Sequence, residues 1–205
     1  IEFYRQRYGI RRAVLPRVMT LSHVQHIARH TLAEIEVFGF GSLCVMVEGR
    51  CALSSYVTGQ SPNTAGVCSP PAHVHWVETE AGVEARLGDV LIDRYAPSEP
   101  RGYPTLCKGR FAVDGERDYA IEEPTSLNTL AILPQLIDAG VAAIKIEGRQ
   151  RSPTYVAEVT RVWRAAIDHA TSSSRYAMQP AWAAQLSRWA EGQQHTLGAY
   201  ERSWR

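Results

Sequence analysis

The chain has 205 residues, and its 22 Lys and Arg nearly balance its 21 Asp and Glu. This balance argues against a broad basic surface for nucleic acid or an anionic membrane. Four cysteines are too few for a disulfide-dense secreted domain, and no apolar run approaches the roughly 20 residues that span a bilayer. Residues 1–12 do not resemble a signal peptide. We therefore expect a cytoplasmic protein, and the start at Ile1 rather than Met indicates a fragment or a processed start.

The first predicted elements alternate between strand and helix. Residues 12–17 predict a short buried strand, and Thr20 is a typical N-cap for a helix with Val24 and Ile27 on its apolar face. Residues 33–40 alternate apolar and acidic side chains, which is typical of a strand. This strand–helix–strand order predicts parallel pairing in an α/β protein.

A cysteine-bearing region then interrupts the alternation. Residues 39–122 contain all four cysteines, many Gly and Pro residues, and short strand-like segments such as residues 90–95. Such composition is typical of turns and irregular structure. We predict an elaborate loop region or small inserted subdomain over about residues 41–122.

The alternation resumes after this insert. Residues 125–140 predict a helix in which Pro134 marks a bend or a helix junction. Residues 141–146 predict a buried strand, and another helix follows. The predicted organisation is a partial α/β domain over residues 1–170, followed by a linker and a helical tail over residues 171–205.

The four cysteines follow the pattern C-x6-C-x16-C-x38-C, at Cys44, Cys51, Cys68 and Cys107. This spacing is neither a zinc-ribbon knuckle nor a bacterial ferredoxin run. Reduced thiols that are grouped in a cytosolic chain are often ligands, and the nearby cations Arg50, Lys108 and Arg110 would offset the charge of an anionic cluster. An iron–sulfur cluster, a structural zinc ion and separate buried thiols all remain open on this pattern.

Three charged residues at a strand end are the candidate catalytic or binding residues. Lys145, Glu147 and Arg149 alternate along the predicted strand, and barrel proteins build their sites at the carboxyl ends of strands. The two cations could hold a carboxylated substrate. The alternative is an internal salt bridge without a role in chemistry.

The residues themselves resemble a known family, the collagenase-like peptidase family U32. The similar segments are FGSLCVMVEGRCALSSY (residues 40–56), SPNTAGVC (61–68) and IKIEGR (144–149), and segments 102–110 and 122–128 are similar to its members in ubiquinone biosynthesis. The resemblance implies that the chain is the C-terminal part of a (β/α) TIM-like barrel. It also implies a [4Fe–4S] cluster on Cys44, Cys51, Cys68 and Cys107.

The function implied by the resemblance is that of an iron–sulfur subunit for oxygen-independent hydroxylation in ubiquinone (coenzyme Q) biosynthesis. The implied partner is a UbiV-like protein in a heterodimer, the substrate a polyprenyl-phenol precursor, and the oxygen source prephenate. RNA-base hydroxylation within the same family is an alternative that the near-zero net charge disfavours, so no nucleic acid is expected. A zinc-stabilised interaction module without catalysis is another. Peptidase activity is not expected, because the chain has neither an H-E-x-x-H helix nor a G-x-S-x-G elbow.

Overall fold

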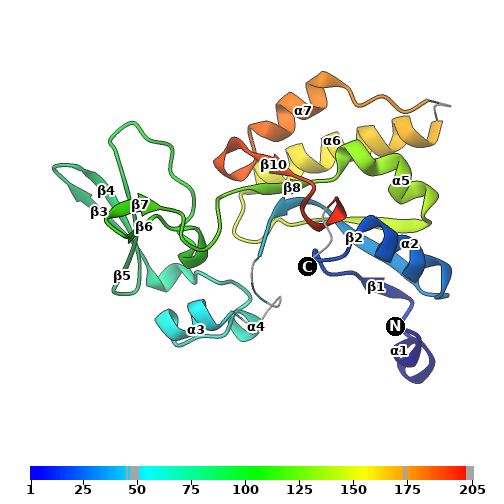
Figure 1. The fold of residues 1–205 in the computed structure, drawn as a ribbon, viewed down its shortest axis with the longest axis horizontal. Helices are drawn as coiled ribbons and strands as arrows, with labels where there is room; N and C mark the ends of the chain where they lie inside the picture. Colours follow the sequence, from blue (N-terminus) through cyan, green and yellow to red (C-terminus); the bar gives the residue numbers. More distant parts are fainter. Residues whose placement is uncertain (45, 47–50, 173–174, 202–205) are drawn as a thin grey trace. The chain divides into compact units, whose positions relative to one another are not determined.

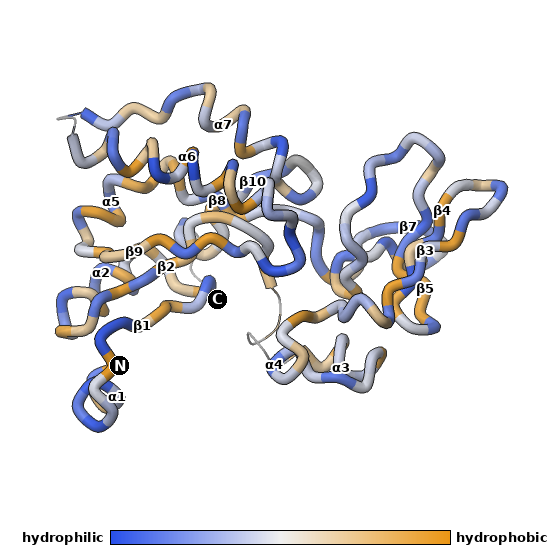
Figure 2. Tube along the Cα trace, turned by 180° about the vertical axis from the view of Figure 1, so that it is seen from behind, coloured by the Kyte–Doolittle hydropathy of each residue, from blue (hydrophilic) through white to orange (hydrophobic). Residues whose placement is uncertain are grey.

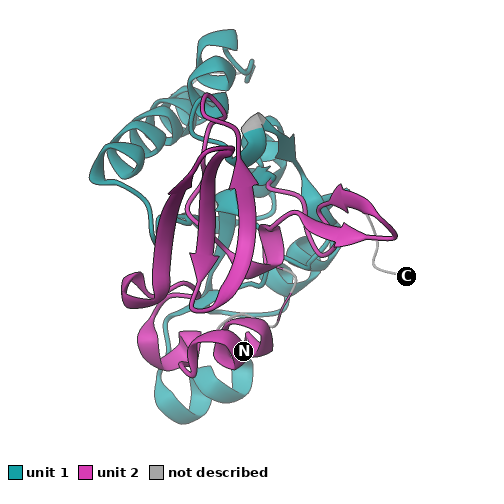
Figure 3. Cartoon of the chain, turned by 90° about the vertical axis from the view of Figure 1, so that its left-hand side faces the viewer, with its two compact units in different colours: residues 1–43, 125–205 teal, residues 44–124 magenta. Residues whose placement is uncertain are grey.

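The computed structural model describes residues 1–44, 46, 51–172 and 175–201. The chain divides into two compact units (Figure 3), of which unit 1 contains residues 1–43 and 125–205 and unit 2 contains residues 44–124. In the described part of the chain, no helix is long and apolar enough to cross a membrane.

Unit 1 is built on a five-stranded sheet with β2 at its centre (Figure 1). Its strands are β1 (Arg12–Val14), β2 (Glu34–Ser42), β8 (Ser126–Asn128), β9 (Val141–Ile146) and β10 (His195–Thr196). Both β1 and β9 pair with β2 in parallel, which confirms the predicted parallel pairing. The short strand β8 pairs with the end of β2 in antiparallel fashion, and β10 lies parallel to β8.

The described part of unit 1 also contains five helices. They are α1 (Glu2–Tyr8), α2 (Leu21–Arg29), α5 (Leu133–Asp138), α6 (Pro153–Ser172) and α7 (Pro180–Ser187), with 3-10 turns η3 (Leu130–Ile132), η4 (Glu191–Gln193) and η5 (Gly198–Tyr200). The predicted cap of α2 is confirmed, because the Thr20 hydroxyl accepts a hydrogen bond from the His23 backbone N–H at 3.2 Å. In Figure 1, α6 and α7 lie side by side.

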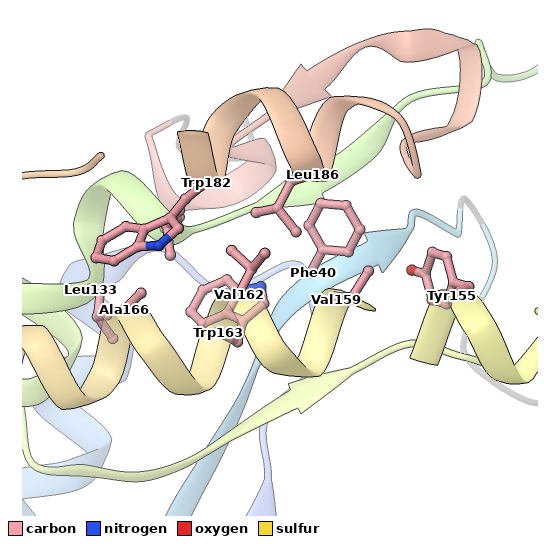
Figure 4. Packing of buried hydrophobic residues seen from close by; sticks show 10 residues of the cluster. Phe40, Leu133, Tyr155, Val159, Val162, Trp163, Ala166, Trp182 and Leu186 are labelled. Atoms are coloured by element: carbon pink, nitrogen blue, oxygen red, sulfur yellow. The ribbon is translucent and has the colours of Figure 1, made fainter. Parts of the chain in front are cut away.

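Two apolar clusters form the core of unit 1. In the first, shown in Figure 4, Trp163 and Val159 of α6 and Leu186 of α7 pack around Phe40 of β2. In the second, Ile35 of β2 packs with residues of α2 and α5. Figure 2 shows the apolar stretches of β2 and β9 in orange. The spacing of apolar residues along α6 places one face of the helix in the core.

The predicted helix over residues 125–140 is wrong in its first half. Residues 126–128 form β8, because their backbones pair with Phe40–Ser42 of β2. The helix α5 begins only at Leu133, so Pro134 lies in its first turn and does not bend it.

The predicted tail over residues 171–205 belongs to unit 1 where the structure describes it. Trp182 and Leu186 of α7 are buried in the first cluster, and β10 extends the sheet. The α/β class is confirmed. The TIM-like barrel is not, because the described strands of unit 1 form an open sheet.

Unit 2 combines a small antiparallel sheet with short helices. The sheet consists of β3 (Val74–Thr79), β4 (Gly82–Leu87) and β5 (Val90–Tyr95), and a separate hairpin of β6 (Phe111–Val113) and β7 (Glu116–Asp118). The helices are α3 (Ala52–Thr58) and α4 (Pro62–Ala65), with 3-10 turns η1 (Pro71–His73) and η2 (Leu106–Lys108). Its buried apolar residues are few, with Leu87 and Ile92 the largest of those fully buried.

Candidate functional site

All four cysteines lie in unit 2, as free thiols. Cys51 is the N-cap of α3, and its sulfur accepts a hydrogen bond from the Ser54 backbone N–H at 3.3 Å. Cys107 lies in η2, which packs against α3. The fold therefore brings α3, which Cys51 caps, into contact with the η2 turn that holds Cys107, although the two cysteines are 56 residues apart in the sequence.

Hydrogen bonds attach the segment of the third cysteine to the same group. The Ser54 hydroxyl donates to the backbone carbonyl of Cys68. The Tyr103 hydroxyl, shortly before η2, donates to the backbone carbonyl of Ser69 at 3.1 Å. The segments of Cys51, Cys68 and Cys107 are thus linked through α3 and the approach to η2.

The four thiols also influence one another electrostatically. Burial is the largest cause that raises the pKa of Cys68, and the charges of Cys51 and Cys44 raise it further. The pKa of Cys107 is raised to about 12, first by burial and then by Glu122, Cys68 and Cys44. Because thiolates repel one another, a cation bound among them would favour the deprotonated form that ligates metals.

The donor set fits a sulfur-ligated centre by its chemistry. Four thiols suit an iron–sulfur cluster or zinc better than a hard cation such as magnesium. Among the residues that the structure describes, no three His, Cys, Asp or Glu side chains are arranged to hold a metal ion. Cys44 is exposed and its sulfur contacts the Met46 carbonyl at 3.5 Å.

The predicted flanking cations have different surroundings. The charge of Lys108 lowers the pKa of Cys107 and so acts as expected of a cation near the thiols. Arg110 forms ion pairs with Asp93 and Glu99. Arg50 lies outside the described residues.

The three candidate residues of unit 1 do not share one environment. Lys145 Nζ lies 3.4 Å from Glu36 Oε1 on the neighbouring strand, and the lysine side chain of this ion pair is 43% exposed. Glu147 follows β9, and its Oε1 accepts a hydrogen bond at 2.8 Å from the backbone N–H of Arg149. Arg149 therefore contacts Glu147 through its backbone N–H.

Glu147 is the most chemically distinctive of the three. Burial raises the pKa of its carboxyl group, which the cations Arg151 and Arg17 partly counteract. Its Oε2 is buried and has no hydrogen-bond partner among the described residues. A buried carboxyl group with a raised pKa can hold or move a proton near neutral pH.

Sequence reasoning missed the groups around Glu147. The Tyr155 hydroxyl donates to the Glu147 backbone carbonyl at 3.0 Å. Arg151 forms an ion pair with Glu191, and the Ser42 hydroxyl donates to Glu191 Oε2 at 3.1 Å. The two arginines at positions 149 and 151 are a sequence signal for a cationic group at the end of β9. Nothing in the sequence connects position 191 to this strand end.

Together, the fold and the two groups of residues define an α/β protein whose sheet is interrupted in sequence by a four-cysteine unit. The chain belongs to the family described as Peptidase family U32, whose model matches residues 1–202.

Three relatives illustrate the range of names in this family. The chain is 29% identical over 191 residues to "tRNA hydroxylation protein P" of Escherichia coli (strain K12), covering 83% of this chain and 42% of the relative. It is 31% identical over 160 residues to "23S rRNA 5-hydroxycytidine C2501 synthase" of the same organism, covering 78% of this chain and 20% of the relative. A "Collagenase" of Porphyromonas gingivalis is 31% identical over 134 residues, covering 65% of this chain and 29% of the relative.

The chain spans about two-fifths of the length of the curated relatives that it matches first. No solved structure matches it.

Proposed function

We propose that this chain is the cluster-bearing part of an oxygen-independent hydroxylase. Its four cysteines would hold one [4Fe–4S] cluster, and the grouping of all four in unit 2 is the observation that carries this proposal. The names of relatives in tRNA and rRNA hydroxylation support hydroxylation as the general chemistry.

The substrate that we propose is the phenol ring of a polyprenyl ubiquinone precursor. Segments 102–110 and 122–128 resemble the ubiquinone biosynthesis protein UbiU, and the net charge of +1 does not favour a long polyanion. This proposal includes a UbiV-like partner in a heterodimer and prephenate as the oxygen donor. It also includes a TIM-like barrel in the longer protein, which the parallel strands β1, β2 and β9 support.

The roles of the residues follow from their surroundings. When bound, the cluster would supply one-electron transfer. Cys51, Cys68 and Cys107 would ligate it from the linked segments of unit 2, and Cys44 would complete the set. In unit 1, Glu147 would hold a proton on its buried Oε2.

A second candidate function is hydroxylation of an RNA base. The observation that favours it is that two of the three relatives reported above are named for the hydroxylation of tRNA or rRNA. It requires a local basic surface that the overall charge of the chain does not predict.

The first experiment is absorbance with iron, sulfide and zinc analysis on protein that is purified without oxygen. We expect a broad band in the region of 400 nm and about four irons per chain. Cys51→Ser is the informative variant, because serine is itself a strong N-cap and keeps α3 while removing the soft ligand. Tyr56→Phe, at an exposed position of the same helix, is the matched control and keeps the band. A colourless protein with one zinc ion would overturn the cluster and support the interaction module.

The substrate is tested in cells that lack the native gene and grow without oxygen. We expect the wild-type protein and Tyr56→Phe to restore ubiquinone, and Cys51→Ser to abolish it. Mass spectrometry of digested RNA runs in parallel. If Cys51→Ser leaves ubiquinone unchanged and loses a hydroxylated nucleoside, the substrate is an RNA base and the phenol proposal is wrong.

A further inference from the structure

Asp93 is a buried carboxylate at the centre of an ionic cluster in unit 2. Its side chain is 1% exposed and lies on β5. Its oxygens accept hydrogen bonds from Arg110 Nε at 3.0 and 2.9 Å, from Arg117 Nη2, and from the Arg94 backbone N–H at 2.7 Å. Removing one partner of a buried ion pair strongly destabilises the fold, because the other charge stays buried without compensation.

The two guanidinium groups come from the chain segment that follows Cys107. Arg110 is three residues beyond this cysteine, and Arg117 lies on β7. Both also donate to the backbone carbonyl of Arg94, at 3.1 Å from Arg110 and 2.6 Å from Arg117. Asp93 therefore joins β5 to η2 and to the hairpin that comes after it.

The backbone beside Arg110 is held against the same strand. A Cβ atom at Gly109 would lie 2.5 Å from the Ile92 carbonyl oxygen and 2.9 Å from its Cγ2 atom. No real side chain tolerates such contacts with a backbone, so only glycine permits this approach. Gly109 and Arg110 thus anchor the end of η2 on β5, one through the backbone and one through the Asp93 ion pair.

We propose that Asp93 is the positioning residue for Cys107. By holding the segment after η2 on β5, it keeps this thiol beside the α3 helix that Cys51 caps. The ligation of a cluster by Cys107 rests on the proposed function. The position of the Cys107 thiol can be tested without any metal.

The decisive experiment measures how fast each cysteine reacts with N-ethylmaleimide, resolved by peptide mass spectrometry. It uses the full chain, as purified and after chelation of bound metal. Asp93→Asn keeps the shape of the side chain and removes its charge. We expect Cys107 to react at least about tenfold faster in this variant, because its segment opens locally, while Cys51 and Cys68 change by less than about twofold.

Glu84→Gln is the matched control. Glu84 Oε1 pairs with Arg94 Nε at 2.9 Å in the same sheet, but that pair makes no bond to the Cys107 segment. It should leave all rates unchanged, and an unchanged Cys107 rate in Asp93→Asn would overturn the proposal. If Asp93→Asn accelerates every cysteine alike, the unit has unfolded. Arg110→Gln then decides, because it removes the pair nearest to Cys107 and keeps the Asp93–Arg117 pair. Glu99→Gln is the control for the other ion pair of Arg110. Selective acceleration of Cys107 in Arg110→Gln but not in Glu99→Gln supports the role, and no acceleration in Arg110→Gln overturns it.

A second readout connects the position of the thiol to the cluster. In protein purified without oxygen, Asp93→Asn should reproduce the loss of iron and the changed electron paramagnetic resonance spectrum of Cys107→Ser. If the wild-type protein binds no cluster, the proposed function fails, and the labelling rates still test Asp93. If the wild type binds a cluster and Asp93→Asn matches it in spectrum and labelling, the positioning role alone is overturned.

Discussion

The two units of this chain are stabilised in different ways. Unit 1 contains both apolar clusters, in which α6 and α7 bury large side chains such as Trp163 and Leu186 against the sheet. In unit 2 the buried apolar residues are Val83, Ala85, Leu87 and Ile92. Unit 2 instead buries the charged Asp93 carboxylate, which pairs with two partly exposed arginines, and a hydrogen bond links the segments of Cys51 and Cys68.

This difference indicates what each unit requires in order to stay folded. Burial of apolar surface contributes roughly 25 cal/mol per Å², so a unit with large buried side chains is stable through packing. Small units with little apolar core usually depend on a metal or another cross-link. We therefore expect unit 2 to depend on the Asp93 ion pairs and on the proposed cluster more than unit 1 does, whereas unit 1 is stabilised by side-chain packing.

The largest effect is expected on chelation of the proposed cluster. If a cluster links the cysteines, chelation should accelerate backbone hydrogen exchange in α3 and β5 on the order of a hundredfold, while β2 and α6 keep their protection. Hydrogen exchange with mass spectrometry measures both units in one experiment. Cys51→Ser should show the fast exchange without a chelator. Equal exchange in all samples would show that unit 2 does not need the cross-link.

The next effect tests the packing of unit 1. Trp163 is 1% exposed, and Trp163→Ala should lower the free energy of unfolding by about 3–5 kcal/mol, because it removes the largest fully buried side chain of the first cluster. Denaturant titration measures the loss. The maleimide rates of the cysteines in unit 2 serve as the internal control, since they should not change if the two units are stabilised independently.

A smaller effect concerns the contact of β2 with β9 and α6. A Cβ atom at Gly39 would lie 2.3 Å from Ile144 Cγ2 and 3.1 Å from the Trp163 ring, so Gly39→Ala should cost about 1–3 kcal/mol. Gly102→Ala in unit 2 is the control, because nothing lies within 4 Å of its Cβ position. Adding Ile144→Ala, which removes the Cγ2 methyl group, to Gly39→Ala tests the cause. If the overlap causes the loss, the double variant should be less destabilised than the sum of the two single changes.

The smallest effect is the pH dependence that Glu147 contributes. Burial raises its folded pKa above the ordinary value of 4.5, so its contribution to stability is fully present below pH 4.5 and is lost as pH rises through the folded pKa. The Glu147→Gln variant lacks this titrating carboxyl group. Unfolding free energies measured across pH should therefore fall less steeply above pH 4.5 in this variant. Identical slopes in the two proteins would contradict the raised pKa.

Much of unit 1 could be predicted from local patterns. The strands near residues 33–40 and 141–146, the Thr20 cap and the parallel pairing follow from periodicity and capping chemistry, which depend on neighbouring residues only. β8 could not be predicted, since Leu127 also fits a helical apolar face. Its conformation is decided by pairing with β2, a segment more than eighty residues earlier.

The sequence by itself determined the α/β class, the position of the cysteine-bearing insert and the sulfur-only donor set, because these depend on composition and local order. Only the tertiary structure decided that Lys145 is paired with Glu36, that Glu147 is buried beside Arg17 and Arg151, and that Asp93 holds the segment of Cys107. Such contacts join residues far apart in the chain. Burial and charge pairing select them during folding, and no short-range pattern carries that information.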